Sequence, residues 1–165
     1  MSNGEMLPGV VRTLKIGEIA VGKSEGVLTS VGVGSCVIII LYHAPTKIGG
    51  LAHILLPSKE YASTRTNPYR FPDEAVAELR CQMEALGAKP DEICGKIVGG
   101  ATLFSQLGKR SIGNLNVSAA KAALKKMSIN LVAEDTLGNQ GRSVYFNLND
   151  GTVKIRILGG GEKII

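Results

Sequence analysis

Short runs of Val, Ile and Leu, separated by Gly and polar residues, occupy most of the first third of the chain. Runs of this length and composition predict β-strands. The predicted strands are Val10–Ile16, Val27–Val31, Cys36–Tyr42 and Ile48–Leu56. The longest wholly apolar run, Cys36–Tyr42, has seven residues and is far too short to cross a bilayer.

The hydrophobic pattern then changes to a helical period. One face of the predicted helix carries Val76, Leu79, Met83 and Leu86, which recur at i, i+3, i+7 and i+10. Pro72 fits the first turn of this helix and Gly87 fits its end. A second helix is predicted over Val117–Met127, with Asn116 as its N-cap.

Further strands are predicted over Lys96–Val98, Asn130–Ala133, Ser143–Leu148 and Val153–Leu158. Strands followed by mixed helices and strands are typical of an α+β fold, here with packed mixed or antiparallel β-sheets flanked by helices. No repeat or linker divides the chain, so we expect a single domain over residues 1–165, with residues 1–10 as a loose N-terminal segment. The segment Pro57–Phe71 shows neither periodicity and is interpreted either as a lid or binding loop or as a plain surface excursion.

Composition narrows the class of protein. The 165 residues, 44% hydrophobic and 20% charged, suit one globular domain. Aromatic residues make up 4% and Trp is absent, so a stacking surface for nucleic-acid bases is not expected. The net charge of +5 favours acidic partners in general, but the basic residues are scattered, and neither Lys109-Arg110 nor the lysines of 121–126 identify a partner.

The N-terminal sequence and the cysteine count predict a cytoplasmic protein. No basic region followed by an apolar stretch opens the chain, so neither a secretory signal nor membrane insertion is expected. Cys36, Cys81 and Cys94 are odd in number and widely spaced, which suits neither a disulfide framework nor a zinc site. One of these free thiols is therefore a candidate for chemistry.

Cys36 and His53 lie on adjacent predicted strands joined by a short connection that contains Pro45. These features predict a β-hairpin. If the turn is centred between Ala44 and Pro45, the residue numbers of each directly opposed pair add up to 89. Cys36 is then opposite His53 on one side of the sheet. The alternatives for the single residues are a small buried Cys and a core histidine bonded to a backbone group.

The run Gly32-Val33-Gly34-Ser35 places small residues immediately before Cys36. Backbone N–H groups of Gly34 and Ser35 can then approach a substrate oxygen closely and stabilise an oxyanion. A thiol beside an imidazole also ionises more readily, and the thiolate is the reactive form. The pattern equally fits an ordinary Gly-rich entry into a strand.

Other candidate residues are weaker. His43 is expected to be solvated in the hairpin turn, Cys81 lies off the apolar helix face, and Cys94 is placed in a connection. The glycines of 99–100 and 159–161 fit no nucleotide-binding spacing and indicate turns or close packing. Glu134 and Asp135 are adjacent on a predicted strand and point to opposite faces, which argues against a shared acid–base or metal site.

Five ordered blocks resemble the CheD family: GSCVIIILY, GGLAHILLP, KIVGGATLF, IGNLN and AEDTLGNQGRSVYFN. The resemblance covers about Ile16 to Gly161. It implies a protein-glutamine deamidase that acts on the cytoplasmic helices of chemoreceptors, with Cys36 as nucleophile and His53 as base. It also implies a fold like that of bacterial glutamine-deamidating toxins, and binding and stimulation of a CheC-type phosphatase.

The family places a hydroxyl residue six positions before its nucleophile, which is Ser30 here in place of the usual Thr. Ser30 would orient His53, and Thr29, facing the opposite side of the strand, would not. Leu115 stands where relatives usually have Arg, and Leu137 where they usually have Gly. These departures concern substrate and partner contacts, because the Cys–His pair is intact.

The reaction implied is acyl transfer from the glutamine carboxamide to Cys36 and then to water, with His53 as the proton carrier. It requires no metal and no organic cofactor. Two alternatives remain: a chemotaxis module that binds without turnover, and a cysteine hydrolase of another acyl substrate such as a receptor methyl ester.

Overall fold

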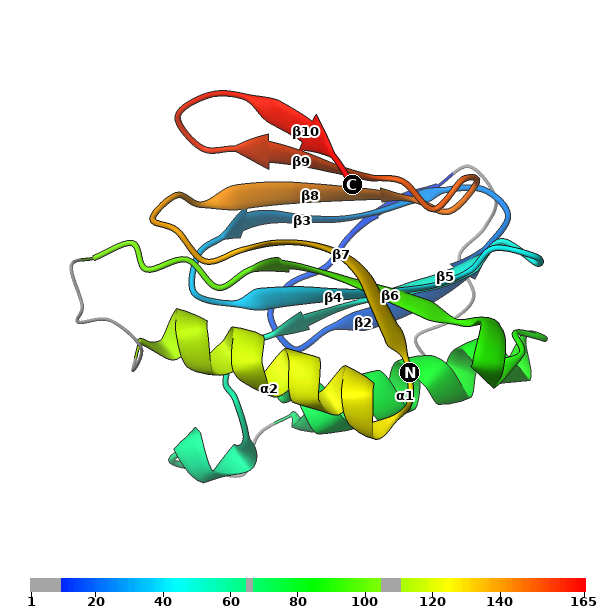
Figure 1. The fold of residues 1–165 in the computed structure, drawn as a ribbon, viewed down its shortest axis with the longest axis horizontal. Helices are drawn as coiled ribbons and strands as arrows, with labels where there is room; N and C mark the ends of the chain where they lie inside the picture. Colours follow the sequence, from blue (N-terminus) through cyan, green and yellow to red (C-terminus); the bar gives the residue numbers. More distant parts are fainter. Residues whose placement is uncertain (1–9, 65–66, 105–110) are drawn as a thin grey trace.

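The computed structural model describes residues 10–64, 67–104 and 111–165. Figure 1 shows three layers, in which a central sheet lies between a second sheet and a pair of helices. The expected α+β fold with packed sheets and flanking helices is confirmed. The expected loose segment 1–10, apart from Val10, and the pair Lys109-Arg110 lie outside the described residues.

The outer sheet has the strand order β1-β3-β8-β9-β10. Its strands are β1 (Val11–Thr13), β3 (Val27–Val33), β8 (Arg142–Asn147), β9 (Val153–Ile157) and β10 (Glu162–Ile164). β1 runs parallel to β3, and the other neighbours are antiparallel. Burial alternates along β8 and β9, so one face of this sheet packs on the core and the other faces solvent.

The central sheet has the order β2-β5-β4-β6-β7. Its strands are β2 (Ile19–Lys23), β5 (Ile48–Ile54), β4 (Val37–His43), β6 (Cys94–Gly99) and β7 (Asn130–Thr136). Every residue of β4 and β5 is buried, because the outer sheet covers one face and the helices cover the other. Two hydrophobic clusters result, one between the sheets and one beneath the helices.

Helix α1 (Pro72–Ala85) begins with Pro72 in its first turn and buries the predicted apolar face against the central sheet. Gly87, just beyond its end, has a φ of +112°, a conformation that glycine adopts without steric cost. The predicted helix is therefore confirmed at both ends. Beside it, α2 (Ile112–Lys126) covers the rest of the same sheet face.

The predicted start of the second helix was wrong by five residues. The N-cap of α2 is Ser111, whose hydroxyl accepts a hydrogen bond from the Asn114 N–H at 3.2 Å. Asn116 lies inside the helix and is completely buried. Asn and Ser are both favourable caps, so composition alone did not distinguish the two positions.

Strands β2 and β10 were not predicted, and both are short. The segment 57–71 contains two 3-10 helices, η1 (Lys59–Tyr61) and η2 (Pro68–Arg70). The end of the segment lies beside β5, because the carbonyl of Arg70 accepts hydrogen bonds from the N–H groups of Leu55 and Leu56. Among the described residues, no helix is long and apolar enough to span a membrane.

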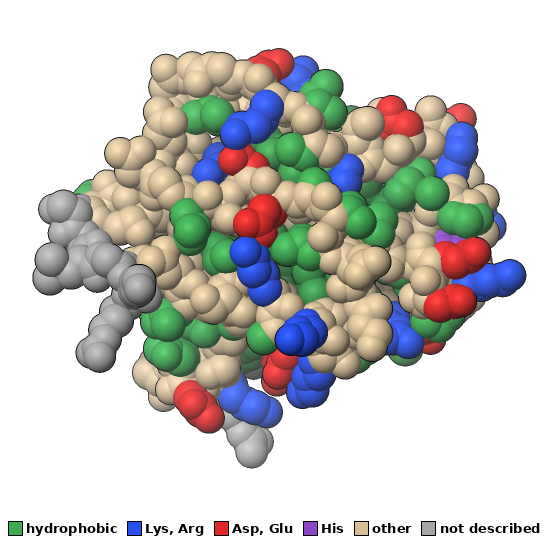
Figure 2. All heavy atoms as spheres, viewed as in Figure 1, with side chains coloured by type: hydrophobic (Ala, Val, Ile, Leu, Met, Phe, Trp, Pro, Cys, Tyr) green, Lys and Arg blue, Asp and Glu red, His purple; other side chains and the backbone are tan. Residues whose placement is uncertain are grey.

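The charges on the visible face are interspersed. Figure 2 shows Lys and Arg side chains next to Asp and Glu side chains on this face, rather than one continuous basic area. Ion pairs such as Lys121–Glu134 and Arg142–Asp135 match this distribution. The net charge of +5 is therefore not gathered into one patch on this face.

Candidate active site

Cys36 lies immediately before β4, at the point where the chain enters the central sheet. Its side chain belongs to the cluster between the two sheets and is 8% exposed. His53, on the neighbouring strand β5, is 5% exposed. Both residues are therefore placed at one end of the β4–β5 hairpin, largely shielded from water.

The hairpin is confirmed, but its predicted register was wrong. His53 is opposite Ile38, and the residue numbers of each directly opposed pair add up to 91 rather than 89. The turn is centred one residue later than expected, because His43 still belongs to β4 and Lys47 takes a left-handed conformation with φ of +56°. The pairing shifts by two positions, so Cys36 and His53 remain on the same face as diagonal neighbours rather than direct ones.

Ser30, on β3 of the outer sheet, reaches across to His53. The distance from Ser30 Oγ to His53 Nδ1 is 2.7 Å. The Ser30 hydroxyl donates its hydrogen to the carbonyl of Leu14, also at 2.7 Å. Ser30 Oγ therefore accepts from Nδ1–H, which leaves Nε2 of a neutral His53 unprotonated and able to accept a proton.

Thr29 points to the other face of β3. Its hydroxyl lies 3.0 Å from that of Thr13 on β1, within the same sheet. Alternation along the strand therefore directs Ser30, and not Thr29, toward the space between the sheets. This is the arrangement expected from the order of the two residues.

Burial sets the protonation states of the pair at rest. It raises the pKa of the Cys36 thiol above its ordinary value of 9.0, and the Cys36 amide N–H offsets this rise in part. Burial also lowers the pKa of His53 below 6.5, against the opposing effects of the Leu14 carbonyl and the Glu18 carboxylate. Burial therefore favours a neutral thiol beside a neutral imidazole and opposes the easier ionisation expected for a thiol next to an imidazole.

The backbone of Gly34–Cys36 has its carbonyl groups engaged and its amides available. The carbonyl of Gly34 accepts a hydrogen bond from the Ala101 N–H, and that of Cys36 accepts one from the Gly100 N–H. The carbonyl of Ser35 accepts one from the Asn116 side chain. Within the described part of the chain, the N–H groups of these three residues donate to no acceptor. They are therefore free to stabilise an oxyanion that develops beside the Cys36 sulfur.

A pocket of about 240 Å³ adjoins this segment. Ser35 forms part of its wall, together with residues 101–104 and 111–113. Its rim is apolar and exposed: Leu103 is 50% exposed and Phe104 is 79% exposed. A Cβ added to Gly34 would lie 2.7 Å from a Leu103 methyl group, so a larger residue there would require the half-exposed Leu103 side chain to shift.

Comparisons with known proteins identify the family. The CheD family, described as CheD chemotactic sensory transduction, matches residues 55–157. A Pyrococcus abyssi protein named probable chemoreceptor glutamine deamidase CheD is 43% identical over 151 residues, covering 90% of this chain and 93% of its own. A Clostridium botulinum (strain Hall) protein of the same name is 42% identical over 160 residues, covering 94% and 99%.

The chain belongs to the CheD family. Its membership is consistent with the ordered blocks, two of which carry Cys36 and His53. Besides Ser30, the chain departs from the CheD pattern at two positions: Leu115 is half-buried in α2, and Leu137 has a φ of +67°. The turn at Leu137 thus keeps the left-handed backbone that a glycine there would adopt readily, at a cost of about 1–2 kcal/mol for a residue with a Cβ.

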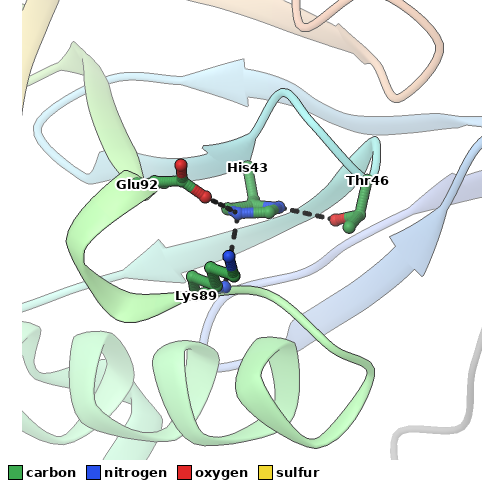
Figure 3. Close-up of polar contacts among 4 residues, drawn as sticks. All are labelled: His43, Thr46, Lys89 and Glu92. Atoms are coloured by element: carbon green, nitrogen blue, oxygen red, sulfur yellow. Dashed lines mark hydrogen bonds and ion pairs between the residues drawn. The ribbon is translucent and has the colours of Figure 1, made fainter.

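His43 was expected to be solvated, and this was wrong. It ends β4 and is 1% exposed. Figure 3 shows its ring between Thr46, Glu92 and Lys89. Nδ1 lies 2.6 Å from Thr46 Oγ1, and Nε2 lies 3.1 Å from Glu92 Oε2 and 3.3 Å from the Lys89 N–H. In this CheD chain His43 therefore joins the hairpin turn to the segment that precedes β6.

The remaining candidates are not brought to the site. Cys81 is exposed on α1, and Cys94 is the first residue of β6 rather than part of a connection. Glu134 pairs with Lys121, whereas Asp135 pairs with Arg142, on opposite sides of β7. Within residues 10–64, 67–104 and 111–165, no cluster of three His, Cys, Asp or Glu side chains is placed to hold a metal.

Two features of the site were missed at the level of sequence. The Leu14 carbonyl orients Ser30, and a backbone group of this kind leaves no mark in the residue pattern. The Asn116 side chain holds the Ser35 carbonyl, and its place within IGNLN, one of the five CheD-like blocks, was the available signal.

Proposed function

We propose that this chain hydrolyses glutamine side chains of chemoreceptors to glutamate, with Cys36 as nucleophile and His53 as general base. The observation that carries the proposal is the chain of hydrogen bonds from Leu14 through Ser30 to His53 Nδ1, which leaves Nε2 available on the face that Cys36 shares. The names of the CheD relatives supply the substrate class.

The first half of the reaction forms a thioester. Nε2 of His53 takes the thiol proton as the Cys36 sulfur attacks the carboxamide carbon, and the carbonyl π electrons move onto oxygen. The free N–H groups of Gly34, Ser35 and Cys36 stabilise the oxyanion. When the intermediate collapses, His53 protonates the nitrogen, the C–N bond breaks and ammonia leaves.

The second half returns the enzyme to its starting state. His53 accepts a proton from water, and the hydroxyl adds to the thioester carbon. The C–S bond then breaks, the sulfur takes up the proton held by His53, and glutamate is released. Ser30 stabilises the imidazolium in both halves, because its oxygen accepts from Nδ1–H. No step requires a metal or an organic cofactor.

The apolar rim beside the oxyanion segment is proposed to receive the receptor. Leu103 and Phe104 present a partly exposed hydrophobic edge next to Gly34. Such an edge suits the apolar face of a receptor helix that carries the glutamine. The reaction is accordingly placed in the cytoplasm, where these helices lie, and a CheC-type phosphatase is a second candidate occupant of the same edge.

The test is incubation with cytoplasmic fragments of chemoreceptors encoded by the same organism. We expect each modified glutamine to gain about one dalton, since NH₂ becomes OH, with release of an equal amount of ammonia. Release of methanol without ammonia would instead identify a methyl-ester hydrolase. Binding without any mass change would identify a module without turnover. Either result would overturn the proposal.

A further inference from the structure

The β4–β5 ladder stops one residue short of the nucleophile. Its last pair is Val37 with Ile54, so neither Cys36 nor Leu55 has a cross-strand partner in the ladder. The two strand ends, which carry the nucleophile and follow the base, must therefore be held together by something other than the sheet.

A single side chain from α2 makes this connection. Nδ2 of Asn116 lies 2.9 Å from the Ser35 carbonyl and 2.9 Å from the Leu55 carbonyl. An amide nitrogen carries two hydrogens, and each carbonyl takes one. Because Leu55 is two residues after His53, one amide group links the helix to both strands of the site.

Through the planar peptide bond between Ser35 and Cys36, this contact also affects the orientation of the Cys36 N–H. In a trans peptide the carbonyl and the N–H point in opposite directions. Since Asn116 fixes the direction of the Ser35 carbonyl, it also fixes the direction of the Cys36 N–H, away from α2. That N–H partly offsets the rise that burial causes in the pKa of the Cys36 thiol.

Within the described part of the chain, the buried amide of Asn116 is satisfied on its nitrogen and not on its oxygen. It is completely buried, and its Oδ1 has no hydrogen-bond partner among the residues that the structure describes. A buried acceptor without a donor destabilises the fold, whereas the two hydrogen bonds of Nδ2 satisfy carbonyls that an apolar side chain would leave without this donor. Packing of α2 therefore does not by itself account for an amide at this position.

We propose that Asn116 is a positioning residue for the reaction at Cys36, because it holds the ends of the strands that bear the nucleophile and the base in one geometry. The inference rests on the proposed function. Asn116 aligns the N–H donors for the oxyanion and does not itself touch the substrate.

The test compares Asn116→Leu and Asn116→Ala with Leu124→Ala. Leu124 lies two turns further along α2, is nearly as buried and packs beside Gly95 of β6, so it controls for loss of helix packing. We expect both Asn116 variants to lower kcat about ten- to a hundredfold while KM changes by less than about threefold. Leu124→Ala should lower the thermal midpoint and leave kcat unchanged.

A second measurement does not depend on deamidation. The rate at which iodoacetamide alkylates Cys36 is followed against pH by mass spectrometry of the peptide that contains it. We expect the rate profile of both Asn116 variants to move to higher pH, because a misaligned Cys36 N–H no longer favours the thiolate, and that of Leu124→Ala to stay in place.

The two readouts separate the possible failures. If the wild-type chain does not deamidate receptors but the alkylation profile still moves, the positioning role stands and the proposed function fails. If Asn116→Leu is folded, with kcat and the alkylation profile both as in the wild type, the positioning role is wrong. If one Asn116 variant does not fold, the other decides between these outcomes.

Discussion

The β4–β5 hairpin carries one buried histidine at each end, and the two have different surroundings. His43 ends β4 at the turn and is 1% exposed, and His53 lies near the open end of β5 and is 5% exposed. Burial therefore does not distinguish them. Their hydrogen bonds do.

Both ring nitrogens of His43 are engaged, Nδ1 by Thr46 and Nε2 by Glu92 and Lys89. The side-chain partner of His53 in the described residues is Ser30, at Nδ1. Within the described part of the chain, no hydrogen bond involves Nε2 of His53. A histidine fixed at one nitrogen and free at the other can exchange a proton with a substrate, whereas one fixed at both serves to hold the fold.

The largest effect should come from Cys36→Ala, which removes the nucleophile at the open end of the hairpin. We expect deamidation to fall by a factor of about a thousand or more, because no other thiol is present at the site, with the circular dichroism spectrum unchanged. The matched control is Cys81→Ala, on the exposed side of α1, which should keep wild-type turnover. Wild-type turnover in Cys36→Ala would refute the nucleophile.

His53→Ala should be nearly as damaging as Cys36→Ala, on the order of a hundred- to a thousandfold, because the thiol then lacks a base. The double variant should be about as slow as either single variant, as expected for residues that act as a unit. Losses that multiply in the double variant would show that the two side chains act independently. Turnover is measured by ammonia release.

Ser30→Ala should lower kcat about ten- to a hundredfold, because His53 loses the acceptor for Nδ1–H and its tautomer is no longer fixed. Ser30→Thr should be tolerated, since it keeps the hydroxyl and narrows χ1. Thr29→Ala is the matched control, because its hydroxyl meets Thr13 on the other face of β3, and it should change kcat less than about twofold. The opposite result would exchange the roles of Ser30 and Thr29.

The pH dependence of kcat/KM should reflect the burial of His53. Because its pKa is lowered from 6.5, the base stays unprotonated to lower pH, and the acidic limb should lie below pH 6.5. The pKa of His53 is lower in the folded chain than in the unfolded chain, so as pH falls the unfolded chain binds this proton first. His53 therefore lowers the stability of the fold as pH falls through and below 6.5. His53→Leu should remove this contribution in urea titrations at pH 5 and pH 7. An acidic limb above pH 6.5 would contradict the assignment.

His43→Ala should have the smallest effect on activity, because His43 lies at the far end of the hairpin. The free energy of unfolding should fall by about 1–3 kcal/mol, since Thr46, Glu92 and the Lys89 N–H lose a buried partner. Activity measured below the unfolding transition should match the wild type. A loss of turnover like that of His53→Ala would end the distinction between the two histidines.

Local pattern was sufficient for the elements that frame the site. Apolar runs predicted β4 and β5, and the helical period predicted α1, because each element buries a face set by its own repeat. Alternation also predicted that Cys36 and His53 share a face and that Ser30 and Thr29 do not. A register shift of two positions leaves such faces unchanged, so this prediction survived the error in the turn.

By itself, then, the sequence determined most of the strands, the first helix, the shared face of Cys36 and His53, and the family to which the chain belongs. Only the tertiary structure decided the partners of each polar group: Leu14 for Ser30, Glu92 for His43, and Ser35 with Leu55 for Asn116. The physical reason is range. Periodicity acts between neighbours in the chain, whereas these hydrogen bonds join residues 16 to 81 positions apart and form only when the sheets and α2 pack together.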